Sequence, residues 1–278
     1  MRIGLPHVGN LYVPMRALMQ ELDVDHVIPP ANSRRTMSLG VKYSPEGLCI
    51  PFKLTLGNMV EAAELGADTI LMAGGSGICR LGYYAKSQEQ ILRDLGYNVE
   101  IVQLGVSQQK LLGFLKMVRR LSNNAPWTRI ISAFRFGLAK LYALDEIEHL
   151  VQKVRAVEVA KGTANRLYAK AIDAIDKASD HSSLKRVRKD YLEQLNKVEK
   201  DKRTPLIVGI TGEFYVVLEP FSNLDVESEL GKLGVEVRRS LFISKWTKFS
   251  WFLNPLGVNE NDRIHQAAMT YLKRDIGG

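Results

Sequence analysis

The chain has 278 residues, with 46% hydrophobic and 24% charged residues and a formal net charge of +8, values that are ordinary for a globular protein with a substantial core. No segment approaches the roughly 20 apolar residues of a membrane helix, and the N-terminus lacks the pattern of a signal peptide. Because the chain also has only two cysteines, we expect a cytoplasmic protein without membrane association.

The first third of the chain alternates short apolar segments with amphipathic ones. Strands separated by helices of 10–15 residues favour parallel pairing with right-handed crossovers, so residues 1–106 are predicted to form an α/β lobe. Asn32 is the expected cap of the second helix, and Pro51 suits the first turn of the third. The predicted strands are 2–6, 25–28, 68–73 and 98–104, and the predicted helices are 11–22, 32–39, 51–65 and 84–95.

The remaining two thirds divide into a helical region and a second α/β pattern. Residues 107–203 have almost no strand pattern and are predicted to be a helical insert interrupted at Pro126. Residues 204–278 begin a second lobe with only two convincing strands, which is too few for a stable sheet. We therefore expect this lobe to be incomplete: either strands elsewhere complete it, or the chain is a shortened form of something longer. Its predicted elements are strands 205–211 and 235–242 and helices 224–233, 246–252 and 262–273.

The positive charge is concentrated in the middle of the chain. Residues 107–203 carry 21 Lys and Arg against 11 Asp and Glu, whereas the two flanking regions are close to neutral. Few aromatic residues accompany these basic ones, although a nucleic-acid groove usually has both. We interpret the basic residues as a solvated helix face, with an acidic protein partner as the alternative, and we expect no nucleic-acid partner. The residues assigned to this face are Lys153, Arg155, Lys161, Arg166, Lys170 and Lys177.

Both cysteines lie in loops that contain Gly or Pro and precede helices. Cys49 belongs to the segment 44–51, and Cys79 belongs to the segment 74–84, which follows a predicted strand. Such loops gather at the carboxyl edge of a parallel sheet, where open α/β folds bind ligands. A thiol at a helix N-terminus is easily held as a thiolate, the form that binds metals. The two cysteines are therefore candidate metal ligands, although isolated cysteines are more often buried and inert.

The cysteine loops are part of a wider resemblance. The chain resembles the D-component-related branch of the 2-hydroxyglutaryl-CoA dehydratase family, whose members are also described as CoA-enzyme activase-related or double-cubane-type proteins. The second cysteine loop is similar to the family pattern G-x-G-P-C-R-F-G-x-Y, with Ile78 at the position of the proline. The segments that carry the resemblance are residues 5–10, 29–36, 39–46, 49–58, 75–84 and 208–223.

The resemblance implies an iron–sulfur protein of two flavodoxin-like lobes, in which Cys49 and Cys79 bind a 4Fe-4S or double-cubane cluster. It also implies a homodimer or heterodimer that receives electrons from an ATP-dependent activator protein with its own cluster. The family usually has a third cysteine after a Gly-Gly-His-Gly-like segment, whereas this chain ends at Gly277-Gly278. We therefore expect the cluster to be incomplete or absent in this chain by itself.

Several other residues are expected near the cysteines. Arg80 would donate hydrogen bonds to cluster sulfides or an anionic substrate, or would form a surface ion pair. The glycines that follow the strand form a tight turn or cradle a phosphate. Turn and loop stabilisation are the preferred roles for the remaining residues, and no catalytic residue is assigned. The candidate lining residues are His7, Asn10, Glu46, Gly75, Gly77 and Arg80.

Three functions follow from these observations. The leading hypothesis is an iron–sulfur electron-transfer protein or reductase related to 2-hydroxyacyl-CoA dehydratases. The first alternative is a cluster-free scaffold or partner-binding subunit with the same fold, and the second is a nucleotide-binding α/β protein that uses the turn 74–77. No residue identifies a CoA pocket, so the substrate is left unassigned.

Overall fold

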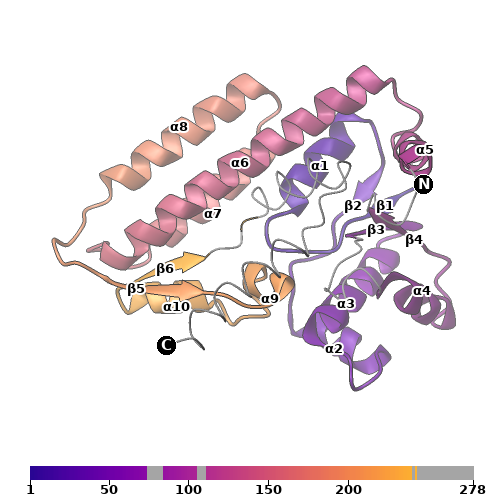
Figure 1. Ribbon diagram of the computed structural model, residues 1–278, viewed down its shortest axis with the longest axis horizontal. Helices are drawn as coiled ribbons and strands as arrows, with labels where there is room; N and C mark the ends of the chain where they lie inside the picture. Colours follow the sequence, from indigo (N-terminus) through magenta and orange to yellow (C-terminus); the bar gives the residue numbers. More distant parts are fainter. Residues whose placement is uncertain (74–83, 105–110, 240–241, 243–278) are drawn as a thin grey trace, which may run out of the picture.

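The computed structural model describes residues 1–73, 84–104, 111–239 and 242, and it is an α/β structure with parallel strands (Figure 1). The predicted fold class is thereby confirmed at this level. The strands are β1 (Ile3–Gly4), β2 (His26–Val27), β3 (Thr69–Ala73), β4 (Glu100–Leu104), β5 (Leu206–Ile210) and β6 (Val235–Arg239). The helices are α1 (Tyr12–Glu21), α2 (Arg34–Tyr43), α3 (Ile50–Glu64), α4 (Tyr84–Asp94), α5 (Leu111–Leu121), α6 (Trp127–Val157), α7 (Thr163–Lys177), α8 (His181–Lys197), α9 (Phe214–Leu218) and α10 (Val226–Lys232).

Within the described ranges, the first sheet has four strands in the order β2-β1-β3-β4, and each neighbouring pair is parallel. This is the strand order of the flavodoxin-like type of doubly wound sheet, and it changes direction between β1 and β3. Ligands of such sheets bind outside the carboxyl ends of the strands at this point. The loops that follow β1 and β3 are therefore the positions from which a site would be built.

Helices cover both faces of this sheet. Ile70 of β3 belongs to a core with Phe52 of α3 and Leu92 of α4. Leu71, the next residue, belongs to the core of the opposite face, together with Met117 of α5. Successive side chains of a strand point to opposite faces, so both must be apolar when both faces are covered. This explains why β3 reads as a continuous apolar segment.

The middle of the chain is helical, and its helices pack directly on the first sheet and on α1. Met117 of α5 and Ala133 of α6 belong to the core of the sheet. The rest of α6 shares a second core with α1, α7 and α8, in which Val13 packs with residues such as Ile147 and Ile175. Figure 1 shows these long helices beside the sheet. No helix in the described ranges is both long and apolar enough to cross a bilayer.

The basic face of this region is largely as expected, with one error. Lys153, Lys161 and Lys170 are exposed, as predicted for a solvated face. Arg155 is buried, so its assignment to that face was wrong. Its Nε donates a hydrogen bond to Asn165 Oδ1 at 2.6 Å, and its stem packs on Gly231 of α10, where the absence of a side chain leaves room for it.

The C-terminal part contains the two predicted strands and one helix that was not predicted. β5 and β6 pair in parallel as a separate two-stranded sheet. Between them, α9 brings Tyr215 into a core with Val8 and Leu54 of the first α/β unit, where Tyr215 is fully buried. Because α9 packs on residues of the first unit, the two parts share a hydrophobic core. The predicted helices 246–252 and 262–273 lie outside the described residues.

Local sequence explains where α2 begins. Ser33, rather than the expected Asn32, is the N-cap, because Ser33 and Thr36 form a reciprocal capping box. The helix then continues to Tyr43, beyond the predicted end. Asn32 is left outside the helix, where its side chain is available for tertiary contacts.

Glycines let α2 and α3 approach each other backbone to backbone. A Cβ atom at Gly57 would lie 2.0 Å from the carbonyl oxygen of Thr36, and one at Gly40 would lie 1.8 Å from that of Lys53. Neither position tolerates a side chain without movement of a helix. This contact fixes α3, and with it the position of Cys49 at its N-terminus.

We predict that Gly57→Ala lowers the free energy of unfolding. Alanine gains about 1 kcal/mol of helix propensity, but the clash with the Thr36 carbonyl forces the helices apart and costs up to about 3 kcal/mol. Urea unfolding monitored by circular dichroism should therefore show a lower midpoint. Gly47→Ala is the matched control, because nothing lies within 4 Å of its Cβ position, and it should change stability by less than about 0.5 kcal/mol. Equal stability of both variants would contradict the backbone contact.

Candidate functional site at the carboxyl edge

Cys49 is the N-cap of α3, and Pro51 follows it in the first turn of the helix. Crossover helices run opposite to the strands of a parallel sheet, so the beginning of α3 lies at the carboxyl edge. Cys49 is partly buried, and its Sγ makes a hydrogen-bond contact with the hydroxyl of Tyr84, the first residue of α4. The Tyr84 ring packs edge-to-face on Phe52, with ring centroids 4.9 Å apart. Cys49 therefore lies directly beside the start of α4.

The other predicted members of the cysteine site are divided between described and undescribed residues. Cys79, Gly75, Gly77 and Arg80 all lie in 74–83, outside the described residues. Glu46 is exposed in the loop before Cys49, and its backbone carbonyl accepts a hydrogen bond from Lys53 Nζ at 3.1 Å. This contact is a loop-stabilising one, although it involves the backbone of Glu46 rather than its carboxylate.

His7 is buried and forms part of a chain of hydrogen bonds. Its Nε2 donates to the Pro29 carbonyl at 2.8 Å, since a carbonyl oxygen only accepts, and its backbone N–H donates to Asn58 Oδ1 at 3.0 Å. Asn58 then donates to Asn32 Oδ1 at 3.0 Å, and Asn32 donates to the Tyr215 hydroxyl at 3.3 Å. Burial and the nearby Glu219 carboxylate raise the pKa of Tyr215, so this phenol stays protonated. This series of hydrogen bonds indicates a structural role for His7.

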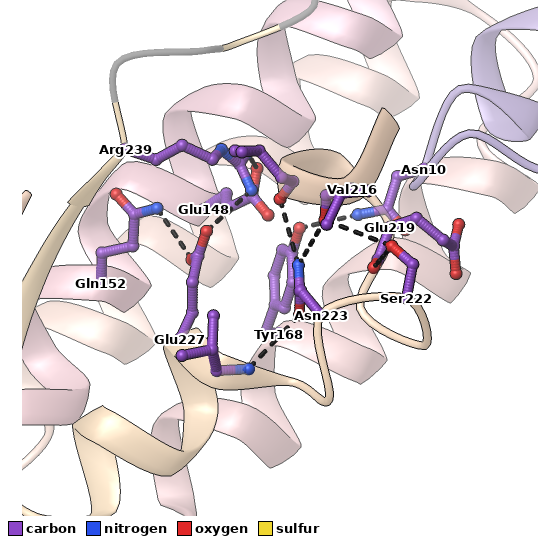
Figure 2. Close-up of polar contacts among 12 residues, drawn as sticks. Asn10, Glu148, Gln152, Tyr168, Val216, Glu219, Ser222, Asn223, Glu227 and Arg239 are labelled. Atoms are coloured by element: carbon purple, nitrogen blue, oxygen red, sulfur yellow. Dashed lines mark hydrogen bonds and ion pairs between the residues drawn. The ribbon is translucent and has the colours of Figure 1, made fainter. Parts of the chain in front are cut away.

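The loop of Gly9 and Asn10 docks on the C-terminal part of the protein. The Gly9 backbone N–H donates to Glu219 Oε2 at 3.0 Å, and Asn10 Nδ2 donates to the Tyr168 hydroxyl at 2.8 Å (Figure 2). Gly9 has a φ of +52°, and a Cβ there would lie 2.6 Å from the Leu218 carbonyl oxygen. Glycine is therefore required for both the backbone conformation and the close approach. Gly9 and Asn10 join α7 and α9 to the first unit.

Asn10 adjoins a buried group of polar residues that the sequence analysis missed (Figure 2). Arg239 of β6 donates to Glu148 Oε2 at 2.6 Å and to Glu227 Oε1 at 2.9 Å. Gln152 donates to Glu227 Oε2 at 2.9 Å, and burial together with Glu148 raises the pKa of Tyr168. We call these five residues the Arg239 cluster. They come from α6, α7, α10 and β6, so the cluster joins four elements.

The signal for the Arg239 cluster in the sequence is weak. Glu148 and Gln152 lie one helical turn apart on the face of α6 that packs inward. Polar residues therefore stand at positions where the helical pattern would lead us to expect apolar ones. Arg239 and Glu148 are 91 positions apart, so no local pattern connects them. Their pairing depends on the tertiary arrangement alone.

A small cavity beside the Arg239 cluster is lined by Gly9, Asn10 and Asp145, among others, and has a volume of about 20 Å³. This is enough space for about one water molecule, so it is no pocket for a substrate or cofactor. In the described part of the chain, no group of three or more His, Cys, Asp or Glu residues is arranged to hold a metal ion. Of the two predicted cysteine ligands, Cys49 is the one that lies in the described part of the chain.

Comparison with known proteins assigns no family to this geometry. No protein-family model matches the chain, and no curated protein gives a significant match. The described part of the candidate site is therefore defined by its own residues, Cys49 at the start of α3 and Tyr84 at the start of α4.

We predict that Arg239→Met destabilises the protein by about 3–5 kcal/mol, because Glu148 and Glu227 would be left close together without their partner. Chemical unfolding at pH 7 measures this loss. Combining Arg239→Met with Glu148→Gln and Glu227→Gln removes the unpaired charges and should recover more than half of it. Wild-type stability of Arg239→Met, or no recovery in the triple variant, would contradict this account.

Proposed function

We propose that the protein is an iron–sulfur electron-transfer protein or reductase related to 2-hydroxyacyl-CoA dehydratases, with Cys49 and Cys79 as cluster ligands. The contact between Cys49 Sγ and the Tyr84 hydroxyl carries this proposal. Tyr84 follows Cys79 by five positions, and a chain of five residues spans at most about 18 Å. This short connection between Cys79 and Tyr84 supports the proposal that the two thiols serve one site.

The surroundings of Cys49 suit a thiolate ligand. The first turn of α3 favours negative charge at its N-terminus, and the Tyr84 hydroxyl is in position to donate a hydrogen bond to the sulfur. The Tyr84 ring is itself held against the buried Phe52. When bound, a cluster would supply one-electron transfer, and hydrogen bonds to its sulfurs would tune the reduction potential.

The ligand count limits what one chain does by itself. A cubane cluster takes mostly four cysteine sulfurs, and this chain contributes two. The remaining ligands would come from a second copy of the chain or from another subunit, so the proposal includes a homodimer or heterodimer. We expect the isolated chain to bind a cluster weakly or not at all.

The same proposal covers the architecture and the electron donor. It includes two flavodoxin-like lobes, with the strand order β2-β1-β3-β4 as support for the first and the parallel pair β5-β6 as the beginning of the second. The electron donor would be an ATP-dependent activator protein with its own cluster, and the compartment would be the reducing cytoplasm.

Anaerobic reconstitution with iron and sulfide tests the ligand assignment. We expect the wild-type chain to retain substoichiometric iron, and Cys49→Ala and Cys79→Ala each to lose it. Glu46→Gln, in the exposed loop beside Cys49, is the matched control and should retain the wild-type content. Iron that both cysteine variants retain would overturn the assignment of Cys49 and Cys79 as ligands, and no iron in the wild type would favour the cluster-free scaffold for the chain by itself.

Mild oxidation with diamide tests the shared position of the two thiols without iron. Because the chain has only two cysteines, an intrachain disulfide has to join Cys49 and Cys79. We expect such a disulfide to form rapidly at low protein concentration, as shown by mass spectrometry after digestion. Two unreacted thiols in the folded protein would contradict a shared site.

A further inference from the structure

A groove of about 520 Å³ lies along β4, which is the outer strand of the first sheet among the described residues. Its floor is the strand from Glu100 to Gln103, and its walls come from α4 and α5, which include Lys86 and Lys116 respectively. α4 packs on one face of the sheet and α5 on the other, so the groove is open along the edge of the strand, between the two helices. We call it the β4 groove. It is separate from the cysteine site in both its residues and its chemistry.

In β4, the backbone N–H and C=O groups of alternate residues point toward this groove. The Glu100 N–H donates to the Asp68 carbonyl at 3.0 Å, so Glu100 points toward β3. In a strand, the N–H and C=O groups of neighbouring residues point to opposite sides. Ile101 therefore directs its N–H and C=O to the outer edge, where a further strand would lie about 4.8 Å away. The edge offers a template for strand addition.

The charges of the groove favour an acidic occupant. Arg120 pairs with Glu100 at 2.7 Å, and Arg93 pairs with Glu89 at 2.6 Å, so these charges compensate each other. Lys86 and Lys116 are exposed and form no ion pair with any described residue. The uncompensated charge of the groove is thus positive, and it comes from both walls.

We propose that the β4 groove binds an extended acidic segment of a partner protein, which adds to β4 as a strand. Main-chain hydrogen bonds to Ile101 would give the segment its direction, as in other complexes formed by strand addition. Successive side chains of a strand point to opposite faces, so two adjacent acidic residues would reach Lys86 on one wall and Lys116 on the other. The recognised feature is therefore a pair of neighbouring Asp or Glu residues within a strand-forming segment.

A fluorescent capped peptide of about eight residues, with two adjacent glutamates flanked by threonine and valine, is the probe. Its affinity for the full chain is measured by fluorescence anisotropy. We expect the double variant Lys86→Glu and Lys116→Glu to bind it about tenfold more weakly. The double variant Lys170→Glu and Lys185→Glu changes net charge equally on exposed residues of α7 and α8, and should bind it like the wild type. Equal losses in both variants, or no binding by the wild type, would overturn the proposal.

Amide hydrogen exchange separates strand addition from simple charge attraction. We expect the peptide to slow exchange in the segment 100–104, and specifically at Ile101. Binding without this protection would overturn the proposal. Protection of Ile101 in the free chain would also overturn it: protection independent of concentration would show that the chain covers its own groove, and protection that increases with concentration would show a second copy there.

Discussion

The carboxyl edge of the first sheet depends on one hydrogen-bonded chain, which runs from His7 through Asn58 and Asn32 to Tyr215. A buried polar group without a partner costs about 1–3 kcal/mol, so each member requires the next. The last member belongs to α9, more than 180 positions from Asn32. The Asn32 side chain, which follows β2, thus has a hydrogen-bond partner in the C-terminal part, and this contact links the two parts of the fold.

The same chain of contacts gives the candidate site a rigid support. Asn58 lies on α3, the helix that begins at Cys49, and α3 is also fixed against α2 by the contacts at Gly40 and Gly57. A ligand held by such a helix is positioned more precisely than one held by a free loop. This rigidity is independent of any bound group, because side chains and backbone of the protein provide all of it.

The local sequence pattern predicted most of the helices and strands. The features that it did not predict depend on contacts between distant parts of the chain. The strands and helices of residues 1–73 appear close to their expected places, because apolar periodicity and Gly or Pro at the ends specify them. Ser33 replaced Asn32 as the cap because both residue types suit that position and only Ser33 has Thr36 three residues later. Burial of Arg155 and its contact with Gly231 could not be read from either helix alone. For the candidate site, the position of Cys49 followed from sequence, whereas its contact with Tyr84 required the packing of α3 against α4.

Helix α6 has 31 residues and is about 46 Å long, with Ala133 in the core of the first sheet and Glu148 in the Arg239 cluster. One uninterrupted helix thus sets both the distance and the relative rotation of these two regions. Inserting a single residue between them would turn everything beyond it by about 100° and would take Glu148 away from Arg239. Length variation among related sequences should therefore be absent from the interior of α6.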